Sequence, residues 1–379
     1  MLAHFGHHLI AALLQPLLPF IRDQFRLNYT QAGWLVSAFN LSYGVSQLPG
    51  GWLSDRVGAR ILITIGVSGV ALCGLFVGIS STYVMMIIFL VVLGLLGGGY
   101  HPASSPLVSD SVEERNRGLA LGFHQIGGTF SFFLSPLIGV GIALALGWRG
   151  SFIALAIPVF IFGIVLYILL GRRGDVGRRE RYIADSQTGT QSVRSQLRRL
   201  VPFIVLGVVL QVFIFSTVSF IPLFVVDTFG ASEAVGAGLL SVAHFAGLVA
   251  GPLGGLLSDR LGKVPVMLVV SLIAGPFIYM LSLVSLNWSM WLVVLLIGTC
   301  QYVGMPISEA YIISHTSGRN RSTMLGIYYL ASRGGPGLLM PALGYIIDHY
   351  DFNTALIIVG AVLLVVAVIC SAFFWRSRD

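Results

Sequence analysis

The sequence predicts an all-α polytopic membrane protein with twelve transmembrane helices in two six-helix halves. Hydrophobic residues make up 56% of its 379 positions and charged residues only 10%, whereas a soluble domain carries roughly 25% charged residues. Apolar segments long enough to cross a bilayer, which takes about 20 residues, recur along the whole chain. The two halves of the chain also match after a shift of 204 residues. These observations exclude a single water-soluble fold.

Twelve apolar segments, separated by short polar or charged breaks, are the predicted spans. The first has no basic n-region and no small-residue cleavage site, so it is predicted to be a span and not a signal peptide. Because it begins so close to Met1, whether the natural start codon lies upstream stays open. In the fourth segment Pro102 leaves the Gly98 carbonyl without a donor, which predicts a break in the helix. The segments are 2–21, 31–53, 61–80, 83–109, 118–146, 150–170, 201–227, 234–257, 264–285, 288–315, 322–347 and 354–375.

A basic stretch at 171–200 divides the chain into predicted six-helix bundles at 1–170 and 201–379. With the N-terminus inside, the inner loops and the C-terminal tail carry 18 of the 22 Lys and Arg residues, and the outer loops carry three. Since basic residues of short loops stay in the cytoplasm, both termini are predicted to be cytoplasmic, in a bacterial inner membrane. The net charge of +7 is spread along one membrane face, which argues against nucleic-acid binding.

The internal repeat is clearest in two loops, 51–58 and 255–262, where six of eight positions are identical. It also pairs Pro102 with Pro306. Apolar helices match by composition alone, but prolines and charged residues do not. Two halves related by a parallel repeat are typical of transporters that bind their substrate near the bilayer midplane, between the halves.

One loop signature occurs twice in the chain, as GWLSDRVGAR at 51–60 and as GLLSDRLGK at 255–263. It resembles the signature loop of the major facilitator superfamily, and the resemblance implies the twelve-helix major facilitator fold. In that family the loop is a conformational latch, which implies a role in balancing conformational states and not in touching substrate. The resemblance implies this role for the loop residues Gly51, Asp55, Arg56, Gly58, Arg60, Gly255, Asp259, Arg260 and Gly262.

A closer but weaker resemblance is to the fosmidomycin-resistance-type branch of that superfamily, whose members export drugs. It rests on His4, on the segments 17–19 and 25–33, and on GYHPASS at 99–105. His8 stands where that branch has an acidic residue, and the fourth span lacks the Arg that drug/proton antiporters often carry. Export and import both stay open.

Ionisable groups inside a membrane are expensive and mark functional sites by default. In the superfamily that the loops resemble, spans 1, 4, 7 and 10 line the central cavity, and three of these spans hold His4, His8, His101 and Glu309. The predicted substrate- and proton-binding residues are His4, His8, His101, Ser104, Ser105, His124, Glu309 and Arg333.

Two pairs among these residues leave alternatives open. His4 and His8 lie one helical turn apart, which favours a proton-titratable or substrate-binding pair. A metal site is less favoured, because the spans offer no Cys or carboxylate at ligand spacing beside the pair. No metal or other cofactor is predicted. Contact of His4 with water or lipid headgroups is a third alternative. Glu309 and Arg333 are either part of a transport site or a buried ion pair that joins two helices.

The predicted function is secondary active transport of a small molecule by alternating access, as a proton-coupled efflux antiporter. The alternative is a proton symporter or a uniporter for a small anionic metabolite. A membrane enzyme is remote, since the chain has no metalloprotease, nucleophile-elbow or phosphate-loop motif. The expected partners are the substrate, protons and the lipid bilayer, and the chain is expected to act as a monomer.

Overall fold

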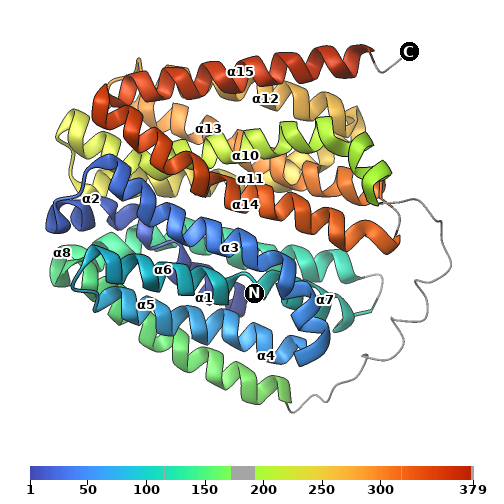
Figure 1. Cartoon of the computed structure of the whole chain (residues 1–379), viewed down its shortest axis with the longest axis horizontal. Coiled ribbons are helices and arrows are strands. Elements are labelled where there is room, and N and C mark those ends of the chain that lie inside the picture. Colours follow the sequence, from blue (N-terminus) through green and yellow to red (C-terminus); the bar gives the residue numbers. More distant parts are fainter. Residues whose placement is uncertain (114–115, 172–192, 317, 377–379) are drawn as a thin grey trace.

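A computed structural model describes residues 1–113, 116–171, 193–316 and 318–376 of the chain. The described residues form helices and no strand. Figure 1 shows the helices running roughly side by side, with the first half of the chain and the second half on opposite sides of the molecule. The predicted linker at 171–200 lies largely outside the described residues.

The first half contains the first six predicted spans. A break at residues 12 and 13 divides the first span, and α8 covers the fifth and sixth spans with a kink at Gly147, whose φ is +72°. The elements are α1 (Leu2–Ala11), α2 (Leu14–Phe25), α3 (Tyr29–Val57), α4 (Ala59–Thr64), the π-helical turn η1 (Ile65–Gly69), α5 (Val70–Gly78), α6 (Tyr83–Gly97), α7 (Tyr100–Asp110) and α8 (Arg117–Gly171).

The second half contains the other six spans, one on each helix. Eight helical segments of the described chain are long and apolar enough to cross a membrane by length and composition. Because the elements of each half make up six spans, the prediction of an all-α protein built from two six-helix halves is confirmed. The helices are α10 (Val193–Phe229), α11 (Glu233–Leu261), α12 (Lys263–Leu281), α13 (Trp288–Ser314), α14 (Gly318–His349) and α15 (Phe352–Arg376).

The predicted break in the fourth span is confirmed. Helix α6 ends at Gly97 and α7 begins at Tyr100, so the chain turns where Pro102 removes the donor that would hold the Gly98 carbonyl. The following residue of α7, His101, is thereby set beside the start of the chain.

The two halves meet most extensively along α3 and α14, which lie side by side in Figure 1. Small residues allow the two backbones to approach closely. A Cβ added to Gly33 would lie 2.5 Å from the Met340 carbonyl oxygen, and one added to Gly44 would lie 2.6 Å from the Gly334 Cα. This seam runs along most of α3.

One end of the molecule, which we call the Arg22 end, is closed by polar contacts between the halves. The Arg22 guanidinium pairs with Asp227, and the Tyr29 hydroxyl donates to the same carboxylate at 2.8 Å. Asp348 accepts from the backbone N–H groups of Tyr29 and Thr30 at 2.8 and 2.9 Å. Burial and the Asp227 carboxylate raise the pKa of the Tyr29 hydroxyl, which stays protonated and can keep donating.

Candidate functional site

A central cavity lies at the junction of the two halves. Helices α1, α2, α3 and α8 supply one side of its wall, and α10, α13 and α14 supply the other. Aromatic rings and Met305 make much of the wall apolar. Its polar residues are His8, Gln15, Asn40, Tyr43, Gln211, Glu309, Tyr328, Tyr329, Ser332 and Arg333.

The charged part of this wall belongs to the second half. Glu309 projects from α13 and Arg333 from α14, and both line the cavity. Among the described residues no salt bridge within 4.0 Å joins them: the Arg333 Nη2 atom lies 3.5 Å from the Met305 sulfur, and Tyr329 lies beside Glu309. The two side chains therefore form no direct ion pair in the described structure, and their role in transport stays a prediction.

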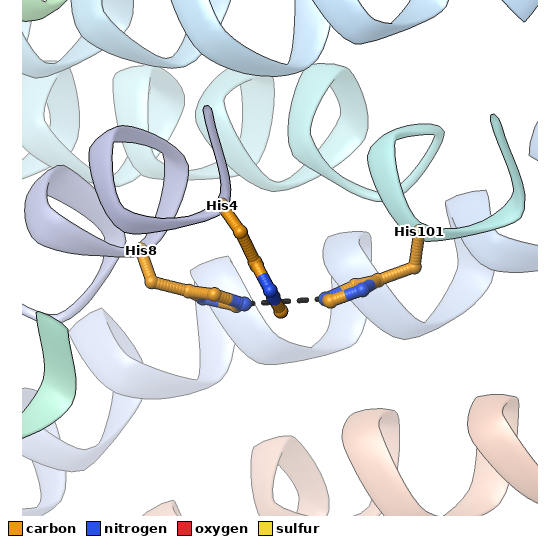
Figure 2. Close-up of side chains that lie close together, drawn as sticks. All are labelled: His4, His8 and His101. Atoms are coloured by element: carbon orange, nitrogen blue, oxygen red, sulfur yellow. Dashed lines mark hydrogen bonds between the residues drawn. The ribbon is translucent and has the colours of Figure 1, made fainter. Parts of the chain in front are cut away.

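The first half contributes a cluster of histidine rings, of which only His8 reaches the cavity. Figure 2 shows His4, His8 and His101 converging from two helices. The Nε2 atoms of His8 and His101 lie 3.2 Å apart, and the ring of His4 stacks on that of His124 at a centroid distance of 4.3 Å. The Nδ1 atom of His4 donates to the His124 carbonyl oxygen at 2.8 Å, which ties α1 to α8.

His7 has a different role from its neighbours, because both of its nitrogens have partners. Its Nδ1 donates to the Gly66 carbonyl oxygen at 2.6 Å, and its Nε2 lies 3.3 Å from the Tyr43 hydroxyl. Gly66 belongs to η1, where the wider turn changes the backbone hydrogen bonding. His7 therefore joins three segments of the first half and is fully buried.

The structure brings together most, but not all, of the predicted site residues. His8, Glu309 and Arg333 line the cavity; His4 and His101 lie behind His8. Ser104 is buried against His124, with 3.4 Å between its Oγ and the ring Nε2, and Ser105 is half-buried outside the cavity lining. His101, Ser104 and Ser105, which were predicted to bind substrate or protons, therefore do not line the cavity in this structure.

Several cavity residues were missed because they are neutral. Tyr43, Gln211 and Tyr328 line the cavity, but the predicted site residues are all ionisable groups or serines. The repeat carries a signal that could have found two of them. A shift of 204 residues pairs Gln211 with His7 and Tyr328 with His124, so polar residues recur at equivalent depths.

The two signature loops have matching backbones. Gly58 and Gly262, each between two helices, have φ values of +95° and +93°, a conformation that glycine adopts without strain. The Arg60 Nε donates to the Tyr167 carbonyl oxygen at 2.8 Å, and Asp259 lies 4.0 Å from Lys263. The side chain of Asp55 lies outside the described part of the structure. The latch role stays a prediction for Asp55, Arg56, Asp259 and Arg260 and for the loop glycines.

Two six-helix halves around a central cavity are typical of membrane transporters, and comparisons with known proteins agree. The family model of the Major Facilitator Superfamily matches residues 1–306 and, in a second match, 237–379. The chain belongs to this superfamily and is a transporter, not an enzyme.

Relatives in two bacterial species extend this assignment. The multidrug resistance protein MdtG of Salmonella heidelberg (strain SL476) is 24% identical over 97% of this chain and 91% of its own length. The probable L-galactonate transporter of Escherichia coli (strain K12) is 30% identical over 41% of this chain, a match that spans only 34% of that relative.

Solved structures share the fold at low identity. A POT family transporter in complex with a thioalcohol-conjugated peptide superposes with a TM-score of 0.81 at 15% identity, covering 100% of this chain and 96% of that one. An inward-facing bacterial homolog of the human lysosomal transporter Spinster gives a TM-score of 0.71 at 18% identity, covering 99% and 94% of the two chains.

Proposed function

We propose that this transporter is a proton-coupled exporter of small amphiphilic molecules, in which Glu309 carries the proton. The observation that carries the proposal is an acidic side chain on the wall of the central cavity without an ion-pair partner within 4.0 Å among the described residues. Burying a carboxylate inside a membrane costs free energy, so such residues are rare and usually have a function. The similarity to a multidrug resistance protein over almost the whole chain supports export.

Competition at one carboxylate would produce antiport. Ionised Glu309 attracts a cationic or strongly polarised substrate, and the aromatic wall provides apolar contact for the rest of the molecule. Protonation removes the negative charge and weakens that attraction. Substrate and proton then occupy the site alternately, and an inward proton gradient drives the substrate outward.

A second function is supported by Arg333, since a guanidinium binds carboxylates in a two-pronged geometry. An anionic metabolite bound to Arg333 would be favoured by protonation of Glu309 in the same cavity, so proton and substrate would bind together and the protein would be a symporter. The partial match to a probable L-galactonate transporter fits this alternative. Release of protons when substrate binds would therefore indicate antiport, and uptake of protons would indicate symport.

The membrane orientation is part of the proposal. With both termini in the cytoplasm of a bacterial inner membrane, as the distribution of basic residues predicts, the Arg22 end faces outward. Closure by Asp227 and Asp348 then seals the outer side in this state. Labelling of single cysteines placed at Arg26 and Arg260 from either side of intact vesicles tests this orientation.

The decisive experiment measures proton movement with purified protein in proteoliposomes, using separate cationic and anionic test compounds. We expect cationic compounds to release protons on binding and to move against their own gradient when a pH gradient is imposed. Glu309→Gln should keep the fold and lose both responses. Glu233→Gln, a carboxylate at the start of α11 outside the cavity lining, is the matched control.

Three outcomes would contradict this proposal. Proton uptake with anionic compounds and no response to cationic ones would replace export with symport. Gradient-driven transport by Glu309→Gln at the parental rate would remove Glu309 from coupling. Labelling of the position 26 cysteine from the cytoplasmic side only would reverse the orientation.

A further inference from the structure

The cluster of histidines behind the cavity has the geometry of a metal site. One ring nitrogen from each of His4, His8 and His101 lies within 4.8 Å of those of the other two, and Figure 2 shows the three rings pointing at one another from α1 and α7. We propose that these residues bind a divalent first-row transition metal ion of the Zn²⁺ class, with one coordination position open toward the central cavity.

The hydrogen bond of His4 fixes which nitrogen is available. A carbonyl oxygen can only accept, so the His4 Nδ1 that lies 2.8 Å from the His124 oxygen must carry the proton. In the neutral ring the Nε2 atom then has a free lone pair. That atom is buried, and it has no hydrogen-bond partner among the described residues. Metal-binding histidines commonly donate their other N–H to a backbone carbonyl in this manner.

The spacing of the other two rings matches a shared ion. Bonds of 2.0–2.1 Å in a tetrahedral site place neighbouring nitrogens about 3.3 Å apart. The Nε2 atoms of His8 and His101 lie 3.2 Å apart. The three ligand nitrogens lie within 4.8 Å of one another, so bringing the third nitrogen to the spacing of about 3.3 Å requires a movement of at most about 1.5 Å.

The remaining position of the ion faces the transport cavity. His8 is the one member of the trio on the cavity wall, so a ligand that completes the coordination must come from that side. Three neutral imidazoles leave both positive charges of the ion uncompensated, and a water molecule, hydroxide or anionic oxygen from the cavity is the expected fourth ligand. Imidazole donors favour Zn²⁺, Co²⁺, Ni²⁺ and Cu²⁺ over Mg²⁺ and Ca²⁺.

His4 and His8 have no Cys or carboxylate at ligand spacing near them in the sequence. The third ligand comes instead from a helix almost one hundred residues away, placed there by the break between α6 and α7. His7 is excluded from the trio because Gly66 and Tyr43 already occupy its nitrogens.

The test uses the full-length protein in detergent, freed of any polyhistidine tag and treated with a chelator. Titration with Co²⁺ alone should give one equivalent per chain with the intense visible absorption of a tetrahedral site, and Zn²⁺ should displace it. His8→Gln and His101→Gln should each weaken Zn²⁺ binding at least 100-fold. His244→Gln is the matched control, since this buried histidine packs on Phe132 and bonds to Tyr302 outside the trio.

A second measurement on the parental protein does not depend on the variants folding: added Zn²⁺ should raise its thermal midpoint, whereas Mg²⁺ should not. Glu309→Gln should bind Zn²⁺ like the parent, so failure of the metal site and failure of the transport proposal are separate results. Substoichiometric binding, weak octahedral-type absorption, or unchanged affinity in both His8→Gln and His101→Gln would overturn the metal site.

Discussion

The two halves of this transporter share a backbone plan but carry different chemistry at equivalent positions. The first half has a packed cluster of histidines, whereas the second half has a charged cavity wall. A shift of 204 residues places Met305 opposite His101, Glu309 opposite Ser105 and Arg333 opposite Thr129. The repeat has therefore conserved helix geometry and loop signatures, and the polar groups have diverged between the halves.

The two regions also differ in how their polar groups are satisfied. His4 and His7 donate to backbone carbonyls of α8 and η1, so these rings hold segments together. Glu309 and Arg333 lie on the cavity wall with no ion pair between them among the described residues. Buried charge in the second half is therefore available for ligands, whereas His7 and the Nδ1 atom of His4 in the first half are committed to the fold.

The largest expected effect is on transport in the double variant Glu309→Met with Arg333→Met. Removing both charges from the cavity should lower the rate of gradient-driven transport at least 100-fold, while the protein stays folded and inserted in the membrane. Since the two side chains form no salt bridge within 4.0 Å among the described residues, neither single variant should show the loss of about 3–5 kcal/mol that follows from breaking a buried ion pair. Thermal unfolding of both single variants and the double variant tests this expectation. A double variant that transports at the parental rate would show that the charged wall is not the site.

The next effect is on stability, in the first half. His7→Ala removes a buried ring and leaves the Gly66 carbonyl and the Tyr43 hydroxyl without their partner, which should cost about 3 kcal/mol or more. The thermal midpoint should fall clearly below that of His315→Ala, an exposed control on the same chain. Equal midpoints for these two variants would mean that the histidines of the first half do not hold the fold.

A smaller effect is expected for Arg333→Lys. The charge is kept, but the planar guanidinium that grips a carboxylate is lost, so anionic compounds should bind about tenfold more weakly, or about 1.4 kcal/mol. Cationic compounds should be unaffected. Arg149→Lys, whose side chain bonds to the Ser80 carbonyl away from the cavity, is the control in the same binding assay. A loss shared by both compound classes would indicate a general packing defect.

The sequence predicted the architecture well because the length and hydropathy of the spans and the internal repeat can all be determined from the chain without knowing how the helices pack. It also predicted the break near Pro102, where one missing N–H has a fixed consequence. Side-chain partners were harder to predict. That His101 approaches His8, and that Ser104 turns to His124, depends on how α7 packs on α1 and α8.

Contacts between the halves were also beyond the sequence. Asp227 is the repeat equivalent of Asp23, yet in the structure it pairs with Arg22 of the other half. Such a pairing depends on the relative placement of two bundles, which no spacing along the chain encodes. Neutral polar residues such as Tyr43 carry no hydropathy signal strong enough to separate a cavity wall from a packed interior.

The smallest expected effect on ligand binding concerns the signature loops. One loop lies in each half, so equivalent substitutions can be compared between the halves. Asp259→Asn, and its repeat equivalent Asp55→Asn, should slow transport several-fold while changing substrate affinity in detergent by less than tenfold, or about 1.4 kcal/mol. The reason is that Asp259 lies on an exposed surface, 4.0 Å from Lys263, and exposed pairs of this kind contribute about 0–1 kcal/mol to stability. A change in rate would then reflect the balance between conformational states and not the cavity. Equilibrium binding and transport, measured on the same preparations, separate these effects. If either variant loses binding outright, the latch role inferred from the loop signature is wrong for that half.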